Sequence, residues 1–137
     1  MSIPSRALDT NILVRFLTGD DTGQLKKVLA LFDAALVNGE RFWVTSTVLL
    51  ELIWVMECFY KLPRTIILDT LEKLADLAVL DLEDAGLLPQ FFALAQQNSM
   101  ELSDLLIACR GNRATAQVTL SFDRKAVKQS KGLMALI

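Results

Sequence analysis

Short apolar runs alternate with segments of helical periodicity along this chain of 137 residues. Four of the runs read as strands, at residues 5–8, 42–44, 79–82 and 117–120. At least one segment with apolar residues at helical spacing separates each run from the next. Strands that are joined through helices form parallel sheets covered on both faces, so we predict an α/β fold with a mostly parallel sheet.

Capping and turn residues set the bounds of the predicted helices. Asp9 begins a first helix that Gly19 stops, and Asp20-Asp21 caps a second that ends at Asn38. Ser103 is the predicted cap of a later helix. The other predicted helices cover residues 45–60, 63–74, 84–97 and 104–113, and a short helix follows Asp123 before a last apolar segment at 133–137.

Composition favours one folded domain. Hydrophobic types make up 53% of the residues, which supplies a core and excludes disorder as the main state. No repeat or flexible linker divides the chain, so we predict a single domain over residues 1–137. The apolar stretch at 42–60 contains Glu51 and Glu57, which disfavour a membrane span. The first residues lack an export pattern, and we expect a cytoplasmic protein in which Cys58 and Cys109 are reduced and buried.

The chain contains no histidine. This excludes a Ser-His-Asp triad, a histidine-ligated zinc site and an imidazole proton shuttle. Chemistry in this protein must therefore depend on carboxylates, hydroxyls, amines or thiols.

Four acidic residues stand next to apolar runs that are expected to be core. Asp9 and Asp123 each follow a predicted strand. Glu51 interrupts one apolar helix, and Asp104 precedes another. Taken singly, helix caps, a turn and a rim charge explain these acids as well as a function does. Taken together they are harder to explain, because buried carboxylates must be paired, protonated or metal-bound and no basic residue interrupts these runs.

The fold suggests what such acids do. Ligands of parallel sheets bind beyond the carboxyl ends of the strands, where Asp9 and Asp123 are expected. Their charges repel unless a divalent cation lies among them, and carboxylates without histidine favour Mg²⁺ or Mn²⁺ over zinc. Such an ion lowers the pKa of a bound water and neutralises charge on a phosphate, so the pattern is suited to phosphodiester hydrolysis.

The motifs around these acids resemble those of PIN-domain nucleases. They are Leu8-Asp9-Thr10-Asn11, Leu50-Glu51-Leu52-Ile53-Trp54-Val55, Leu102-Ser103-Asp104 and Ser121-Phe122-Asp123. Their order, their spacing and the chain length are similar to those of the bacterial VapC-like toxins. The resemblance implies a three-layer α/β/α sandwich with a central, mostly parallel sheet of four to five strands. It also implies a metal-dependent endoribonuclease that cleaves single-stranded or loop RNA, forms a homodimer and is neutralised by a cognate antitoxin.

The resemblance also implies roles for particular residues. The catalytic carboxylates that bind Mg²⁺ or Mn²⁺ are those of Asp9, Glu51, Asp104 and Asp123. Asn11 and Ser121 are implied to orient these acids or a metal-bound water through hydrogen bonds. Glu101 stands at a position that is often acidic in the family, whereas Lys125 replaces a further acid that some relatives have.

Charge is distributed unevenly along the chain. Residues 105–137 hold six basic residues and one acidic residue, a net charge of +5, whereas residues 1–104 hold eight basic and 15 acidic residues, a net charge of −7. Cations beside a metal site attract a phosphate backbone. We therefore predict that RNA contacts Arg110, Arg113, Arg124 and Lys125, with an ordinary solvated surface as the alternative.

Aromatic residues near the third predicted helix divide into two groups. Trp54 and Met56 are expected to pack in the core. Phe59 and Tyr60, at the helix end, either pack in the core or form part of an apolar groove for an antitoxin helix or for the second subunit, and the resemblance favours the groove.

Two other functions are compatible with the sequence. A receiver-like signalling module has a similar length and an acidic Mg²⁺ pocket, but its paired acids follow the first strand, whereas Asp20-Asp21 follows a helix. A catalytically inactive PIN scaffold would keep the fold and bind RNA or protein without cleavage.

Overall fold

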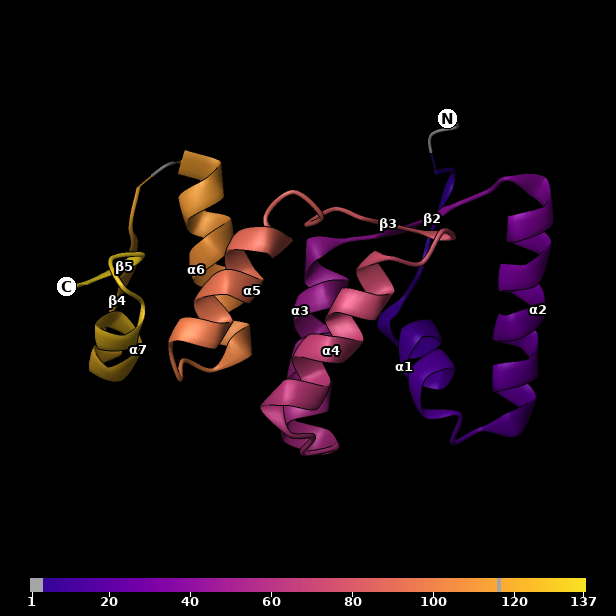
Figure 1. The fold of residues 1–137 in the computed structure, drawn as a ribbon, viewed down its shortest axis with the longest axis horizontal. Helices are drawn as coiled ribbons and strands as arrows, with labels where there is room; N and C mark the ends of the chain where they lie inside the picture. The colour runs from indigo at the N-terminus through magenta and orange to yellow at the C-terminus, as the bar shows by residue number, and fades with distance from the viewer. Residues whose placement is uncertain (1–3, 116) are drawn as a thin grey trace. The chain divides into compact units, whose positions relative to one another are not determined.

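The computed structural model describes residues 4–115 and 117–137, and the chain divides into two compact units. The first unit ends at Ala85 and the second begins at Gly86. Each contains parallel strands and helices, as Figure 1 shows. The predicted α/β class with parallel pairing is confirmed. A single domain with a single central sheet stays a prediction.

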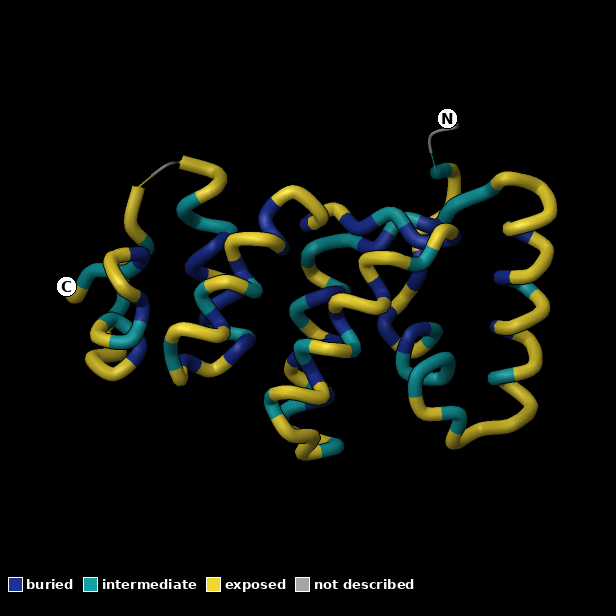
Figure 2. The backbone as a smooth tube through the Cα atoms, viewed as in Figure 1, coloured by how far each residue is buried: buried dark blue, intermediate teal, exposed yellow. Residues whose placement is uncertain are grey.

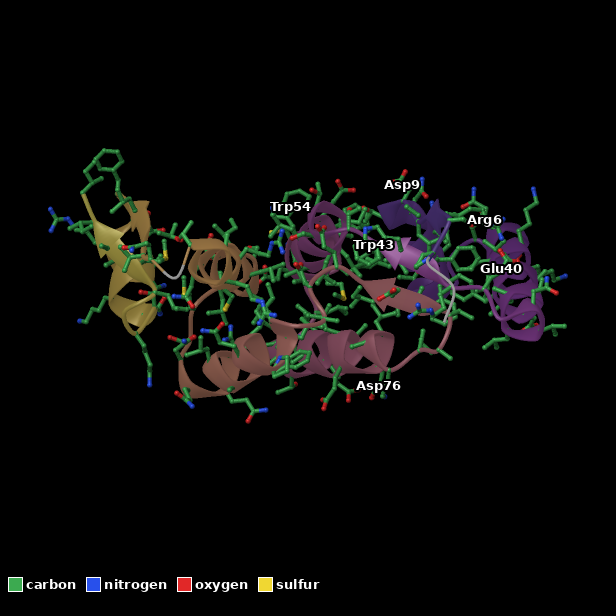
Figure 3. The ribbon with its side chains drawn as sticks, turned by 90° about the horizontal axis from the view of Figure 1, so that it is seen from above. Arg6, Asp9, Glu40, Trp43, Trp54 and Asp76 are labelled. Atoms are coloured by element: carbon green, nitrogen blue, oxygen red, sulfur yellow. The ribbon has the colours of Figure 1, made fainter. Side chains whose placement is uncertain are left out.

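The first unit is built on a three-stranded parallel sheet. Its strands are β1 (Arg6–Ala7), β2 (Phe42–Val44) and β3 (Leu80–Leu82), in the order β1-β2-β3. Ala7 pairs with Trp43, and Phe42 pairs with Leu80. Charged side chains at the sheet edge form surface ion pairs, such as Arg6 with Glu40 at 3.0 Å, which lie side by side in Figure 3.

Helices cover this sheet in the order that the sequence predicts. They are α1 (Thr10–Thr18), α2 (Thr22–Asn38), α3 (Ser46–Trp54) and α4 (Arg64–Ala75), with a π-helix, η1 (Val55–Phe59), between the last two. Helix α1 packs against α2 and α3, and α4 packs against β3 and η1. In Figure 2 the buried residues of α2 face α1 and its exposed residues lie on the opposite side. This pattern is typical of an amphipathic surface helix.

Caps explain where these helices begin and end. The Asp21 carboxylate accepts the Gln24 N–H at 2.9 Å at the start of α2. Gly19 and Gly39 follow α1 and α2 in the left-handed region, with φ of 62° and 69°, which favours glycine. Thr45 caps α3 by accepting the Val48 N–H at 3.2 Å. The predicted bounds of both early helices are confirmed.

The second unit begins with a helical pair. Helix α5 (Leu88–Gln97) packs against α6 (Leu102–Thr115), and each contributes fully buried side chains, such as Phe91 and Leu105. Strand β4 (Thr119–Ser121) then leads into helix α7 (Arg124–Gln129) and strand β5 (Met134–Leu136). The two strands pair in parallel, with Thr119 opposite Met134.

Several predicted bounds differ from the structure. Helix α3 ends at Trp54 and continues as a π-helix, not as one α-helix to residue 60. Helix α5 begins at Leu88 and not at residue 84, and Pro89 lies in its first turn, where proline leaves no helical hydrogen bond unmade. Helix α6 begins at Leu102, so Ser103 lies inside its first turn and is not its cap.

Two side chains lie in different environments from those predicted. Trp54 is 55% exposed and projects outward from α3 in Figure 3, so the prediction that it packs in the core is wrong, whereas Met56 is buried as expected. Cys58 is exposed, against expectation, and Cys109 is buried. Burial raises the pKa of the Cys109 thiol to about 11, which keeps this thiol protonated near neutral pH. In the described part of the chain, no helix is both long and apolar enough to cross a membrane.

The single-domain prediction is tested by comparing two probes of unfolding. Both tryptophans, Trp43 and Trp54, belong to the first unit, whereas far-UV circular dichroism reports the helices of both units. A single cooperative domain unfolds with coincident transitions, so we expect the same urea midpoint from both probes. W54F, which leaves Trp43 as the sole reporter, controls for local loosening around the exposed indole. Two separate midpoints would contradict the prediction.

Candidate functional site

Two of the four predicted acids belong to the first unit. Asp9 follows β1 and caps α1, where its Oδ1 accepts the Thr10 N–H at 2.8 Å. Glu51 lies within α3 and is exposed. Asn11 is exposed in the first turn of α1, two residues after Asp9. Both acids therefore project from the surface of this unit.

The helix that carries Glu51 is held at its start by two side chains. Thr45 caps it, and Glu83 at the end of β3 accepts the Ser46 N–H at 2.7 Å. An acid near a helix N-terminus interacts favourably with the unpaired N–H groups there. These contacts fix the start of α3 against the sheet and thereby the position of Glu51.

The other two acids belong to the second unit. Asp104 is half-buried in the first turn of α6. Asp123 follows β4 and caps α7, where its Oδ1 accepts the Ala126 N–H at 3.0 Å. The Ser121 hydroxyl accepts the Asp123 N–H at 3.0 Å. Ser121 therefore holds the backbone of an acid, in keeping with the orienting role predicted for it.

Asp104 and Asp123 line one small cavity of about 80 Å³. Glu101 and Lys125 line the same cavity. The structure thus brings together two of the four predicted acids and Glu101, which stands at a position that the resemblance marks as often acidic. Asp9 and Glu51 are in the first unit, and their convergence with this cavity stays a prediction.

Two further polar residues of the cavity were not predicted. Ser99 and Gln129 complete its lining, and the Gln129 Nε2 donates to the Ser99 Oγ at 2.7 Å. These residues are 30 positions apart, and neither stands in a motif, so the sequence carried no signal for this pairing. The bond links the segment before α6 to helix α7. Helix α6 carries Asp104, and α7 follows Asp123 directly.

The chemistry of the donor set fits a hard divalent cation. The predicted ligands supply only carboxylate oxygens, which Mg²⁺ and Mn²⁺ prefer. Asp9 and Asp123 each use Oδ1 as a helix cap, which leaves Oδ2 outside the capping bond. Across residues 4–115 and 117–137, however, no three acidic or cysteine side chains gather closely enough to hold a metal ion. A complete metal centre is therefore not seen within the described residues.

The predicted RNA-contacting cations differ in their surroundings. Arg113 donates from Nη1 to the Gly86 carbonyl at 3.0 Å, and a Cβ on Gly86 would stand 2.6 Å from its Nη2. Arg113 therefore ties the end of α6 to the start of its unit. Arg124 and Lys125 are exposed at the start of α7, next to Asp123. Their contact with RNA stays a prediction, as does that of the half-buried Arg110.

The first unit contains an apolar groove of about 300 Å³. Side chains of α1, α3, η1 and α4 line it, including Val14, Leu52, Met56 and Tyr60. Phe59, the neighbour of Tyr60, does not line the groove and is 72% exposed. An apolar groove therefore lies at this helix end with Tyr60 in its wall, and its use by a partner stays a prediction.

A hydrogen-bonded carboxylate holds one end of this groove. Asp20 accepts the Thr18 hydroxyl at 2.8 Å and the Tyr60 hydroxyl at 3.0 Å, and Arg15 lies 3.1 Å from it. The Thr18 hydroxyl, then the Tyr60 hydroxyl, hold the pKa of Asp20 below its ordinary value of 3.8. Because Thr18 and Tyr60 both line the groove, Asp20 connects its two sides.

The chain is similar to known proteins over most of its length. The PIN domain family matches residues 6–131. A VapC ribonuclease of Aquifex aeolicus (strain VF5) is 23% identical over 123 residues, which make up 90% of each chain.

The acid range of pH tests the contacts of Asp20. Y60F removes one hydroxyl donor and T18V removes the other, so each variant should raise the pKa of Asp20 toward 3.8, T18V by more. When folding lowers the pKa of a carboxyl group, the group stabilises the folded protein at pH values above the pKa of the unfolded state. This stabilisation is lost as the pH falls through the pKa of the folded state. Both variants should therefore lose less stability than the wild type below pH 3.8.

Carboxyl ¹³C chemical shifts measured against pH give the pKa of Asp20 directly. D33N removes an exposed carboxylate of α2 and serves as the control, with no change expected at Asp20. An Asp20 pKa that is the same in Y60F, T18V and wild type would contradict the assignment.

Proposed function

The chain belongs to the PIN-domain family, and from this premise we propose that it is a metal-dependent endoribonuclease that cleaves single-stranded or loop RNA by phosphodiester hydrolysis. One observation carries the proposal. Two carboxylates from separate elements, Asp104 on α6 and Asp123 between β4 and α7, line one cavity together with a lysine. The similarity to a VapC ribonuclease supports RNA as the substrate and the role of toxin in a toxin–antitoxin pair.

The proposed metal ligands are Asp9, Asp104 and Asp123, with Glu51 completing the site directly or through water. When bound, Mg²⁺ or Mn²⁺ lowers the pKa of a water molecule and neutralises charge that develops on the phosphate. The chain's own part is to present the acids in a fixed direction. Capping bonds hold Asp9 and Asp123, and the Ser121 hydroxyl holds the backbone of Asp123.

RNA binding is proposed for the basic residues near the cavity. Arg124 and Lys125 begin α7 directly after Asp123, and Arg110 lies on α6 with Asp104. Cations at these positions attract the phosphate backbone toward the acids. Arg113 is also proposed to contact RNA, through the part of its guanidinium that the Gly86 carbonyl leaves accessible.

A protein partner is proposed for the apolar groove of the first unit. Its lining from α1, α3, η1 and α4 suits the apolar face of an amphipathic helix. The residues up to 104 carry a net charge of −7, which favours a basic partner, and we propose the cognate antitoxin. The family also leads us to propose a homodimer in the cytoplasm.

Cleavage of RNA tests the proposed activity. The purified protein should cleave a mixed-sequence single-stranded RNA with Mg²⁺ or Mn²⁺ and lose this activity in EDTA. D104N should reduce cleavage by about 100-fold or more, because even residues that only support metal ligands contribute on the order of 10–100-fold. D33N makes the same substitution on α2 and should retain full activity. Equal cleavage by D104N and D33N would refute the proposed site.

Metal binding is tested without RNA. Millimolar Mg²⁺ should raise the melting temperature, because a ligand that binds only the folded state stabilises it. D104N should abolish the increase, and NaCl at equal ionic strength should not reproduce it. No shift in the wild type would argue against the site. A shift without RNA cleavage would favour the inactive scaffold, and a stable aspartyl-phosphate after treatment with a small phosphodonor would favour the receiver-like alternative.

A further inference from the structure

We propose that Lys125 binds the scissile phosphate in the cavity and supplies a positive charge that the carboxylates there lack. The inference rests on the proposed nuclease function, and it gives Lys125 a role distinct from general attraction of RNA. Lys125 lines the same cavity as Glu101, Asp104 and Asp123. A phosphate that enters this cavity therefore comes next to three acidic residues and one lysine.

The position of Lys125 is fixed by the start of α7. Asp123 caps this helix, and Lys125 is its second residue. The Asp123 backbone is held by Ser121, and its carboxylate is held by the Ala126 N–H. Ala126 is buried, which anchors the first turn from the other side. The stem of Lys125 thus begins from a rigid turn two residues beyond an acid of the site.

In the described part of the chain, the Lys125 ammonium forms no ion pair with another side chain. Within the described residues, ion pairs at 4.0 Å or less involve other cations, such as Lys73 with Asp69 at 2.9 Å. Lys125 lines a cavity with three acidic residues, and over residues 4–115 and 117–137 it forms no such pair. Its charge is therefore available to an anionic ligand.

A phosphodiester needs this charge. Carboxylates alone repel a phosphate, whereas a lysine ammonium is a compact point charge that binds phosphate oxygens. A cation aimed at an oxygen on which charge develops also lowers the barrier to phosphoryl transfer. A phosphodiester adds a further negative charge to the three acids of the cavity, and Lys125 is the cation of the lining that can offset it.

This role predicts opposite effects on two ligands when Lys125 is replaced by glutamine. Loss of a positive charge beside the acids should tighten Mg²⁺ binding, measured by titration calorimetry without RNA. The same loss should weaken RNA binding in EDTA, measured by fluorescence anisotropy with a labelled single-stranded RNA. The slope of log affinity against log salt should fall in magnitude by about 0.7, the value for one phosphate contact of a single strand.

The rate of RNA cleavage in Mg²⁺ under single-turnover conditions should be about 100-fold lower in K125Q than in the wild type. Removal of one group that stabilises developing negative charge has an effect of this size in other enzymes. K125R keeps the charge and should recover part of the rate. K128Q removes the same charge from the same helix, outside the cavity, and should match the wild type in all three measurements. An unchanged melting temperature of K125Q in EDTA excludes a folding defect.

The outcomes separate this inference from the proposed function. If the wild type cleaves RNA with Mg²⁺ and K125Q behaves as K128Q does, the inference is overturned and the nuclease function stands. If the wild type does not cleave RNA, the nuclease function fails. The inference is then decided by RNA binding in EDTA, where equal salt slopes for K125Q and K128Q overturn it.

Discussion

A hydrogen bond between an aspartate and an N–H group in the first turn of the following helix forms the two strand–helix junctions at which Asp9 and Asp123 lie. Asp9 makes this bond at 2.8 Å and Asp123 at 3.0 Å. Loss of such a cap costs a helix about 1 kcal/mol, so the fold favours a capping side chain at these positions, and aspartate is one of the residues that supply it. The bond engages one carboxylate oxygen and sets the direction of the other. Structure and proposed chemistry therefore use the same side chain without competing for the same atom.

Local stereochemistry was the part of the fold that could be predicted. Gly19 ends α1 because only glycine adopts its backbone conformation without strain, and Asp21 begins α2 through a side-chain bond, so both bounds are encoded within a few residues. Helix α3 is apolar on nearly every side. The periodicity of its apolar residues therefore could not show whether Trp54 lies on the buried or the exposed face. The π-helix was missed for a similar reason, since five apolar-rich residues do not distinguish its spacing from that of an α-helix.

The residues of the candidate site that stand in sequence motifs could be predicted, and the others could not. Asp104 and Asp123 were identified from apolar context and from resemblance, and the structure places both in one cavity. Ser99 and Gln129 were not, because their hydrogen bond depends on how α7 packs near the start of α6, which no short pattern encodes. Sequence also gave no sign that Arg113, predicted to contact RNA, has a second role. Its guanidinium donates a hydrogen bond to a backbone carbonyl of its own unit.

The π-helix between α3 and α4 has a consequence for the groove wall. Its last hydrogen bond runs from the Tyr60 N–H to the Val55 carbonyl at 3.1 Å, five residues back. An α-helix turns by about 100° per residue, so a chain one residue shorter at this point would point Tyr60 away from Asp20. The hydrogen bond between Tyr60 and Asp20 therefore depends on the number of residues in the π-helix. Length variation among relatives at residues 55–59 would reshape the partner surface even where every groove-lining side chain stayed the same.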